Sequence, residues 1–227
     1  MHAPSDALTV RDRALARSDV EALPAGTALV DCDLEEADLS QLDLSGWRFE
    51  RCILRRTGLS GAKLEGTRWK SCRGAFADFA GSDLNDAIFT ASDFNNASFR
   101  RAGVEGARFT HCKLTGANLT DLKAVEVQFE ETLLIGARLR KHGFRKTRFL
   151  RVDMSQADLR ECDFRLATFE ESSLREAILD GARFEDADLR GADLGGLRLA
   201  DAARFRGAII SRDQAALLLD QLGLRVL

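Results

Sequence analysis

Cysteine and histidine are the residues of this 227-residue chain best suited to chemistry, because they act as nucleophiles, bases and metal ligands. Four of the five cysteines are 20 or 40 residues apart, and Ser92 fills the gap in that series. This spacing differs from that of a zinc site, in which paired ligands are a few residues apart. The cysteines are Cys32, Cys52, Cys72, Cys112 and Cys162.

A five-residue repeat runs through most of the chain. From Leu29 to Leu199, 35 positions lie five residues apart, and 18 of them are Leu and 12 are Phe. Only Gly74 and Ala124 lack a large apolar side chain at this central position. The position two residues earlier, termed the small position, holds mostly Ala, Cys, Thr and Ser. Larger side chains occupy it at Leu42, Trp47, Leu122, Val127, His142, Val152 and Leu197.

A period of five matches neither an α-helix nor an extended strand. It matches a chain that turns a corner every five residues and points its central and small side chains inward. A second period of 20 indicates four sides per coil, because one series of central positions collects most of the large aromatic residues. The series is Leu29, Phe49, Trp69, Phe89, Phe109, Phe129, Phe149, Phe169 and Leu189.

The expected fold is therefore all-β: a right-handed quadrilateral β-helix, or solenoid, of about nine coils of 20 residues, followed by a short C-terminal α-helix. Since strands stack about 4.8 Å apart, the rod would be about 40 Å long. A single coil cannot cover its own apolar side chains, so neighbouring coils must share one core.

The repeat places every cysteine at a small, inward position. We interpret the cysteines as reduced core residues, because stacked side chains run parallel and are poorly oriented for a disulfide. His2 lies in the N-terminal tail, His111 at a corner and His142 at a small position. No catalytic residue, metal ion or cofactor is therefore expected.

The N-terminal segment, residues 1–26, is predicted to be a tail and a degenerate capping coil. Val10, Leu15 and Val20 keep the five-residue spacing in a shifted register. A short helix over residues 7–23 is the competing interpretation. Residues 1–5 are expected to be disordered.

The repeat region is predicted to span residues 27–210, with one residue gained near Ala202 and Ala203. In residues 211–227, Ser211 and Gln214 have the spacing of a capping box, and Gly223 would end the helix. The helix could fold back over the last coil. Its leucines are spread more widely than one buried stripe requires, which favours a symmetric dimer. The expected dimer interface is Leu217, Leu218, Leu219, Leu222, Leu224, Val226 and Leu227.

The charge pattern is mixed. The net charge of −3 does not indicate direct nucleic-acid binding. Residues 132–152 form a basic belt without an acid, whereas residues 153–193 are richer in acids. No apolar run approaches 18 residues and no signal-peptide pattern is present, so a cytoplasmic protein without a membrane partner is expected. The belt contains Arg138, Arg140, Lys141, Arg145, Lys146, Arg148 and Arg151.

Units such as residues 157–161 and 187–191 resemble the pentapeptide-repeat family. Residues 210–215, the apolar helix and residues 222–224 resemble the C-terminal end of its topoisomerase-protecting members. These are the Qnr and MfpA quinolone-resistance group and the self-immunity proteins of gyrase-toxin producers. The chain looks more like the members without inserted loops, because its repeat is uninterrupted between Leu29 and Leu199.

This resemblance implies a non-enzymatic homodimer that mimics DNA in shape and binds DNA gyrase or topoisomerase IV, protecting it from quinolones or a toxin. The basic belt departs from simple DNA mimicry. The alternative is a structural or protein-interaction solenoid with an unrelated partner. The acids that the resemblance would place on the topoisomerase-facing surface are Asp158, Glu161, Asp163, Glu176, Asp180, Glu185, Asp186 and Asp188.

Overall fold

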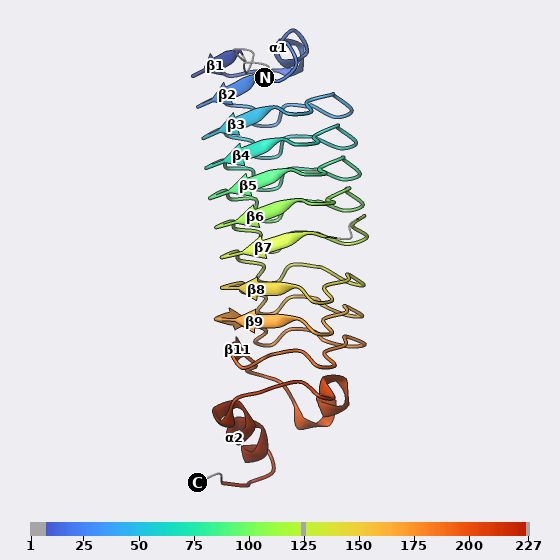
Figure 1. Cartoon of the computed structure of the whole chain (residues 1–227). Helices are drawn as coiled ribbons and strands as arrows, with labels where there is room; N and C mark the ends of the chain where they lie inside the picture. Colours follow the sequence, from blue (N-terminus) through green and yellow to red (C-terminus); the bar gives the residue numbers. More distant parts are fainter. Residues whose placement is uncertain (1–7, 124–125, 226–227) are drawn as a thin grey trace, which may run out of the picture.

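The computed structural model describes residues 8–123 and 126–225 as a rod of stacked coils with the two chain ends at opposite ends of the rod (Figure 1). One strand from each coil contributes to a parallel sheet in the order β1 to β9. The quadrilateral β-helix expected from the sequence is confirmed. The strands are β1 (Thr9–Arg11), β2 (Ala28–Val30), β3 (Arg48–Glu50), β4 (Arg68–Lys70), β5 (Ile88–Thr90), β6 (Arg108–Thr110), β7 (Gln128–Glu130), β8 (Arg148–Leu150) and β9 (Thr168–Glu170).

The coils stack in a constant 20-residue register from β2 to β9. Phe49 pairs with Trp69, and Trp69 pairs with Phe89. We term the side that carries this sheet the first side, and number the other three in chain order. A small second-side sheet joins β10 (Ser172–Ser173) to β11 (Ala192–Asp193). Each strand is short because the chain turns a corner every five residues.

Backbone hydrogen bonds between coils hold the corners. The residue two positions after the central one has a left-handed φ at most corners, including 53° at Arg51 and 60° at Glu161. This conformation costs about 1 kcal/mol for a residue with a Cβ. Most of these residues also donate their N–H to the next coil, as Arg51 does to Lys70 O at 2.8 Å. The left-handed conformation of the corners is therefore stabilised by hydrogen bonds that form only when the coils are stacked.

The preference for Asp or Asn just before the central residue has a structural cause. The N–H just after the central residue often has no ladder partner, and an unpaired buried amide is costly. The Asp33 carboxylate accepts the N–H of Glu35 at 2.9 Å, and the Asp153 carboxylate accepts that of Ser155 at 2.9 Å. These side chains make Asx turns, so many acids of the repeat accept hydrogen bonds from backbone N–H groups.

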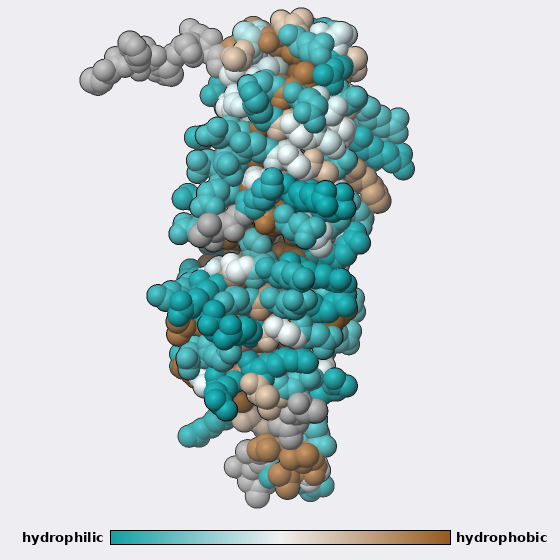
Figure 2. Space-filling view, turned by 90° about the vertical axis from the view of Figure 1, so that its right-hand side faces the viewer, coloured by the Kyte–Doolittle hydropathy of each residue, from teal (hydrophilic) through white to brown (hydrophobic). Residues whose placement is uncertain are grey.

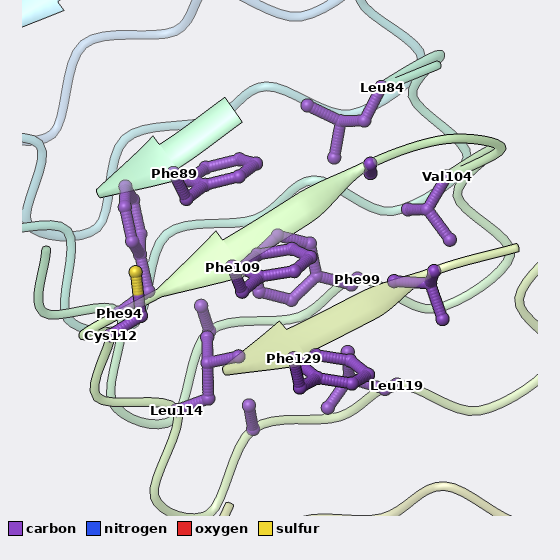
Figure 3. Close-up of a cluster of buried hydrophobic side chains, with 14 of the residues drawn as sticks. Leu84, Phe89, Phe94, Phe99, Val104, Phe109, Cys112, Leu114, Leu119 and Phe129 are labelled. Atoms are coloured by element: carbon purple, nitrogen blue, oxygen red, sulfur yellow. The ribbon is translucent and has the colours of Figure 1, made fainter. Parts of the chain in front are cut away.

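The core is a column of inward side chains, shown in part in Figure 3. Phe89 and Phe109 stack with ring centroids 4.6 Å apart, and Phe99 meets Phe109 edge-on at 5.8 Å. The exception at Gly74 is explained by the next coil. A Cβ there would lie 2.2 Å from Cε1 of Phe94, whose ring occupies the space.

The first coil combines both sequence-based interpretations. Val10 pairs with Leu29, which is the shifted register, and Val10, Leu15 and Val20 are buried. A short helix, α1 (Arg17–Glu21), forms part of this coil, although it is shorter than the helix proposed for residues 7–23. Arg17 Nη1 donates to Ser40 O at 3.0 Å and so caps an exposed edge. Residues 1–5, which were expected to be disordered, lie outside the described residues.

The one-residue insertion predicted near Ala202 is present. The bridge from Thr168 to Asp188 spans 20 residues, and the next, from Asp188 to Ile209, spans 21. A 3-10 helix, η1 (Leu199–Phe205), contains the added residue. The chain then enters α2 (Arg212–Asp220), where Ser211 and Gln214 form the predicted capping box.

The stack is interrupted at one place. β7 and β8 pair only through Glu130 and Leu150, whereas the flanking pairs are in register over all three residues. Figure 1 shows β8 set further from β7 than the preceding strands are from one another. We term this interruption the seam.

Truncation of a stacked phenylalanine tests the core. We expect Phe109→Ala to lower the free energy of unfolding by about 3–5 kcal/mol, because a buried ring between two coils is lost. Denaturant unfolding followed by circular dichroism measures this loss. The matched control, Arg108→Ala on the exposed side of the same strand, should change stability by less than about 0.5 kcal/mol. Equal losses in the two variants would contradict the inward orientation of Phe109.

Candidate interaction surfaces

The five thiols are buried and free, and their positions are those of core residues. Burial raises the pKa of Cys112 to about 11 and that of Cys162 to about 12. Thiols with such pKa values stay protonated near neutral pH and are poor nucleophiles. Cys72 Sγ donates to Phe49 O at 3.3 Å, so this small polar side chain also satisfies a backbone carbonyl of the preceding coil.

The two histidines within the described chain have different surroundings. His111 lies at an exposed corner, with Nδ1 2.8 Å from Glu131 Oε2. His142 is only 6% exposed, and its ring centroid is 4.5 Å from that of Phe144. Its Nε2 is buried without a hydrogen-bond partner. Burial lowers the pKa of His142 to about 4, so the imidazole is neutral at physiological pH.

Residues 8–123 and 126–225 contain no group of three or more His, Cys, Asp or Glu side chains that could hold a metal ion. Over the same residues, no helix has both the length and the apolar character needed to cross a membrane. The candidate sites are therefore surfaces on the rod and at its C-terminal end.

The eight acids expected to face a topoisomerase do not form one patch. Asp158 and Asp180 lie on the third side, Asp163 and Glu185 on the fourth, and Asp188 on the first. The stretch looks acidic in the sequence, but winding distributes it around the rod. The remaining three acids occupy three different corners: Glu161, Glu176 and Asp186.

Most of these carboxylates are paired with cations. Asp158 is 7% exposed and lies 2.5 Å from Arg140 Nε and 2.8 Å from Arg160 Nε. The hydrogen bond from Arg165 holds the pKa of Asp163 below its usual value. This stretch thus presents ion pairs rather than a row of bare carboxylates. The other pairs are Glu161–Lys141, Asp180–Arg204, Glu185–Arg183 and Asp188–Arg190.

The basic belt also extends around several sides. Arg138 and Arg140 lie on the third side, Arg145 on the fourth and Arg148 on the first. Arg148 is paired with Glu170 of the next coil. The belt is therefore partly neutralised and is not a flat basic face.

Apolar side chains gather at the C-terminal end of the rod (Figure 2). Leu217, Leu222 and Leu224 are 72%, 60% and 52% exposed and form what we term the C-terminal leucine surface. Leu218 and Leu219 are half-buried, and α2 has no fully buried residue. Two further residues of the expected dimer interface, Val226 and Leu227, lie outside the described residues.

The other face of α2 covers the last coil. Gln214 Nε2 donates to the backbone oxygens of Leu189 and Ala192, both at 2.7 Å. A cavity of about 180 Å³ remains under the helix and is lined by Leu197 and Leu218 among others. The sequence identified Gln214 only as a capping-box residue, because the spacing contains no information on which carbonyls its amide reaches. One helix therefore caps the solenoid and leaves leucines exposed.

A family model, Pentapeptide repeats, matches the chain in eight copies over residues 29–68, 75–110, 112–149, 128–165 and 167–202. The chain belongs to the pentapeptide-repeat family. Comparison of this pentapeptide-repeat protein with curated proteins finds no match.

Two solved structures of QnrB1, a plasmid-mediated fluoroquinolone resistance protein, are similar to this pentapeptide-repeat protein over nearly the whole chain. A trypsin-treated variant is 24% identical with a TM-score of 0.55, covering 97% of this chain and 98% of that chain. Full-length QnrB1 is 22% identical with a TM-score of 0.55, covering 96% and 98%. HetL from the cyanobacterium Nostoc sp. strain PCC 7120 is 19% identical with a TM-score of 0.37, covering 81% and 86%.

The buried imidazole makes the stability of this pentapeptide-repeat protein depend on pH. His142 has a pKa of about 4 in the folded state, against an ordinary histidine pKa of 6.5, so the unfolded chain binds its proton first on acidification. The contribution of neutral His142 to the free energy of unfolding is fully present above pH 6.5. It is lost as the pH falls from 6.5 to 4, and the total loss is about 3 kcal/mol.

We expect His142→Leu to flatten the pH dependence of the unfolding free energy in that window. His111→Leu serves as the control, because His111 is exposed and should leave the His142 contribution intact. Denaturant titrations at pH 7, 5.5 and 4 measure the effect. An unchanged slope in the His142 variant would show that the imidazole is not buried as a neutral group.

Proposed function

We propose that this protein is a non-enzymatic, cytoplasmic binding protein that mimics DNA in shape and binds a type II topoisomerase, DNA gyrase or topoisomerase IV. Binding would protect the enzyme from inhibitors such as quinolones or from a gyrase-targeting toxin. The observation that carries the proposal is the match to QnrB1 along almost the full length of both chains.

The physical basis of the proposal is competition for a surface that binds DNA. Such a surface is basic, and a rigid rod with carboxylates at its corners can occupy it without chemistry. Of the acids predicted to face the enzyme, Glu176 and Asp186 have no ion-pair partner among the described residues. We assign them the largest share of the attraction, because paired carboxylates such as Asp158 would need to exchange partners.

We also propose that the protein is a homodimer. The C-terminal leucine surface has no cover within the described chain, and a two-fold axis would pair it with its own copy. Apolar burial contributes about 25 cal/mol per Å² of surface removed from water, so a few leucines per copy make a substantial contribution. Half-buried Leu218 and Leu219, with Val226 and Leu227, remain part of the proposed interface.

The alternative is an interaction solenoid with an unrelated partner. The ion pairing in residues 153–193 favours this alternative, because most of the acids proposed as a DNA-like surface are neutralised within the chain. An unrelated partner protein with a complementary shape and charges of both signs would fit this surface as well as a topoisomerase would.

The dimer is tested at its most exposed leucines. We expect Leu217→Asp combined with Leu222→Asp to convert a dimer into a monomer with unchanged circular dichroism, because two charges would be buried at the axis. Sedimentation equilibrium measures the mass. The matched control is Phe76→Asp, which changes an exposed apolar residue on a repeat corner. A leucine double variant that remains dimeric would remove the C-terminal surface from the interface.

A supercoiling assay with purified gyrase, a quinolone and titrated protein tests the function. We expect supercoiling to be restored with increasing protein. Glu176→Lys with Asp186→Lys should raise the concentration needed by about tenfold, corresponding to about 1.4 kcal/mol. Glu65→Lys, at an exposed acid in the N-terminal half, is the control and should have little effect.

If the protein neither rescues nor inhibits supercoiling at any concentration, topoisomerase binding is rejected. Capture of a different protein by the intact dimer, without a topoisomerase subunit, would then favour the alternative. Equal weakening by the Glu65 control would show that the acids act through net charge rather than as a defined surface.

A further inference from the structure

The aromatic stack on the fourth side of the rod ends in the last coil. Phe164 stacks on Phe144 with ring centroids 5.3 Å apart and on Phe184 at 4.9 Å. Phe184 in turn stacks on Phe205 at 4.7 Å, with the two rings 17° from parallel. Among the described aromatic residues, only Phe184 has a ring contact with Phe205. The face of Phe205 that is turned away from Phe184 therefore carries no stacked ring.

The cavity under α2 lies at the end of this aromatic stack. Its volume is about 180 Å³, and we term it the cap cavity. Phe205 lines it from η1, Leu189 and Leu194 line it from the last coil, and Leu218 lines it from α2. Eight of the nine described residues around it are apolar. The free end of the aromatic stack thus borders an apolar space.

The change from coil to helix explains why this space exists. The last bridge of the first side joins Asp188 to Ile209, and the chain then leaves the path of the coils and enters α2. An α-helix with its side chains is about 10–12 Å wide, whereas stacked coils are about 4.8 Å apart. The helix therefore cannot follow the inner contour of a coil, and space remains between it and the inward side chains below.

Water is a poor occupant of the cap cavity. A buried water needs two to four polar partners, and apolar cavities stay dry. Within the described chain, the buried side-chain nitrogen and oxygen atoms without a hydrogen-bond partner belong to Trp47, His142 and Glu185, which do not line the cavity. Its one described polar residue, Arg198, has a side chain that is 77% exposed, and its Nε donates to Asp201 at 3.3 Å. The cavity therefore favours an apolar occupant.

An adjoining pocket of about 190 Å³ shares Phe205 and Arg198 with the cap cavity and gives access to it from the surface. The charged groups of this pocket are paired with one another. Arg204 lies 3.1 Å from Asp201 and 3.2 Å from Asp180, and Arg198 is also paired with Asp201. An anionic or cationic ligand would have to displace one of these partners, so the lining favours a neutral ligand.

We propose that the cap cavity binds a small, flat, neutral aromatic molecule of about one ring. The bound ring stacks on the free face of Phe205 and extends the fourth-side stack by one layer. Leu189, Leu194 and Leu218 contact its remaining surface. The volume is suitable, because an apolar cavity of about 150 Å³ lined by Leu, Ile and Phe binds benzene.

The inference is independent of topoisomerase binding and of the proposed dimer. Leu217 and Leu222, the most exposed residues of the C-terminal leucine surface, do not line the cap cavity. Leu218 of the same helix does line it. One helix therefore has its outer leucines exposed at the end of the rod and an inner leucine at the ligand site.

Binding is measured by titrating benzene into the intact, methyl-labelled protein and recording its NMR spectrum. We expect saturable ring-current shifts of the methyl groups of Leu218 and Ile210, which line the cavity. The methyl groups of Leu59, a buried residue of the N-terminal half, should not shift. Benzoate should bind at least about tenfold more weakly, because its charge would be buried without a free partner. Absence of saturable shifts, or equal binding of benzoate, would overturn the proposal.

Three variants locate the site. Ala208→Leu places a larger side chain in the cavity lining and should weaken benzene binding at least about tenfold. The matched control, Ala203→Leu, changes an exposed residue of η1 outside the lining and should retain binding. Phe205→Leu keeps an apolar side chain but removes the aromatic face, and it should weaken binding about fivefold. Equal benzene affinity in all three variants, with unchanged circular dichroism, would show that benzene binds elsewhere.

Two further measurements distinguish the ligand from occupants that the protein itself could supply. In the free protein, we expect no nuclear Overhauser effects between the Phe205 ring and the methyl groups of Val226 and Leu227. The variant Leu217→Asp with Leu222→Asp should bind benzene within about twofold of the unmodified protein, because neither residue lines the cavity. Such Overhauser effects would show that the C-terminus fills the cavity, and loss of binding in the double variant would place the site in the dimer interface. Either result would overturn the proposal.

Discussion

Every coil of this protein depends on the next for two things that a single coil cannot provide. It needs acceptors for its corner amides, such as the bond from Arg51 N–H to Lys70 O, and it needs a cover for its inward side chains. Both needs are met only when residues 20 apart lie above one another. Stacking at this spacing fixes the register. The hydrogen bonds between coils offset the cost of the left-handed corners, and the inward side chains pack into one continuous core.

The same requirement limits what the surface can do. Acids before the central residue are engaged by the backbone, and several of them also hold an arginine two positions later, as Asp163 holds Arg165. An acid-rich stretch of sequence therefore becomes a set of local ion pairs distributed around four sides. Within residues 153–193, the corner carboxylates of Glu176 and Asp186 have no ion-pair partner among the described residues.

The regular stacking ends at the C-terminus and is interrupted at the seam. At the C-terminus, Gln214 satisfies the carbonyls of the last coil, so α2 can cap the stack with one face and leave Leu217 exposed on the other. At the seam, β7 and β8 pair only through Glu130 and Leu150, and Nε2 of His142 is buried without a hydrogen-bond partner. At these two places the regular stacking of the coils ends or is interrupted.

The sequence alone determined the fold, because the five-residue spacing of Leu and Phe specifies which side chains point inward regardless of context. It also located the cysteines in the core, the capping box at Ser211 and the inserted residue near Ala202. It could not show that Asp158 is held by Arg140 from the preceding coil, or that Gln214 reaches Leu189. It listed Leu122, Val127 and His142 as exceptions without showing that they lie in the coils on either side of the seam. Those relations join residues about 20 apart through the winding of the chain, and only the stacked structure decides which side chains meet.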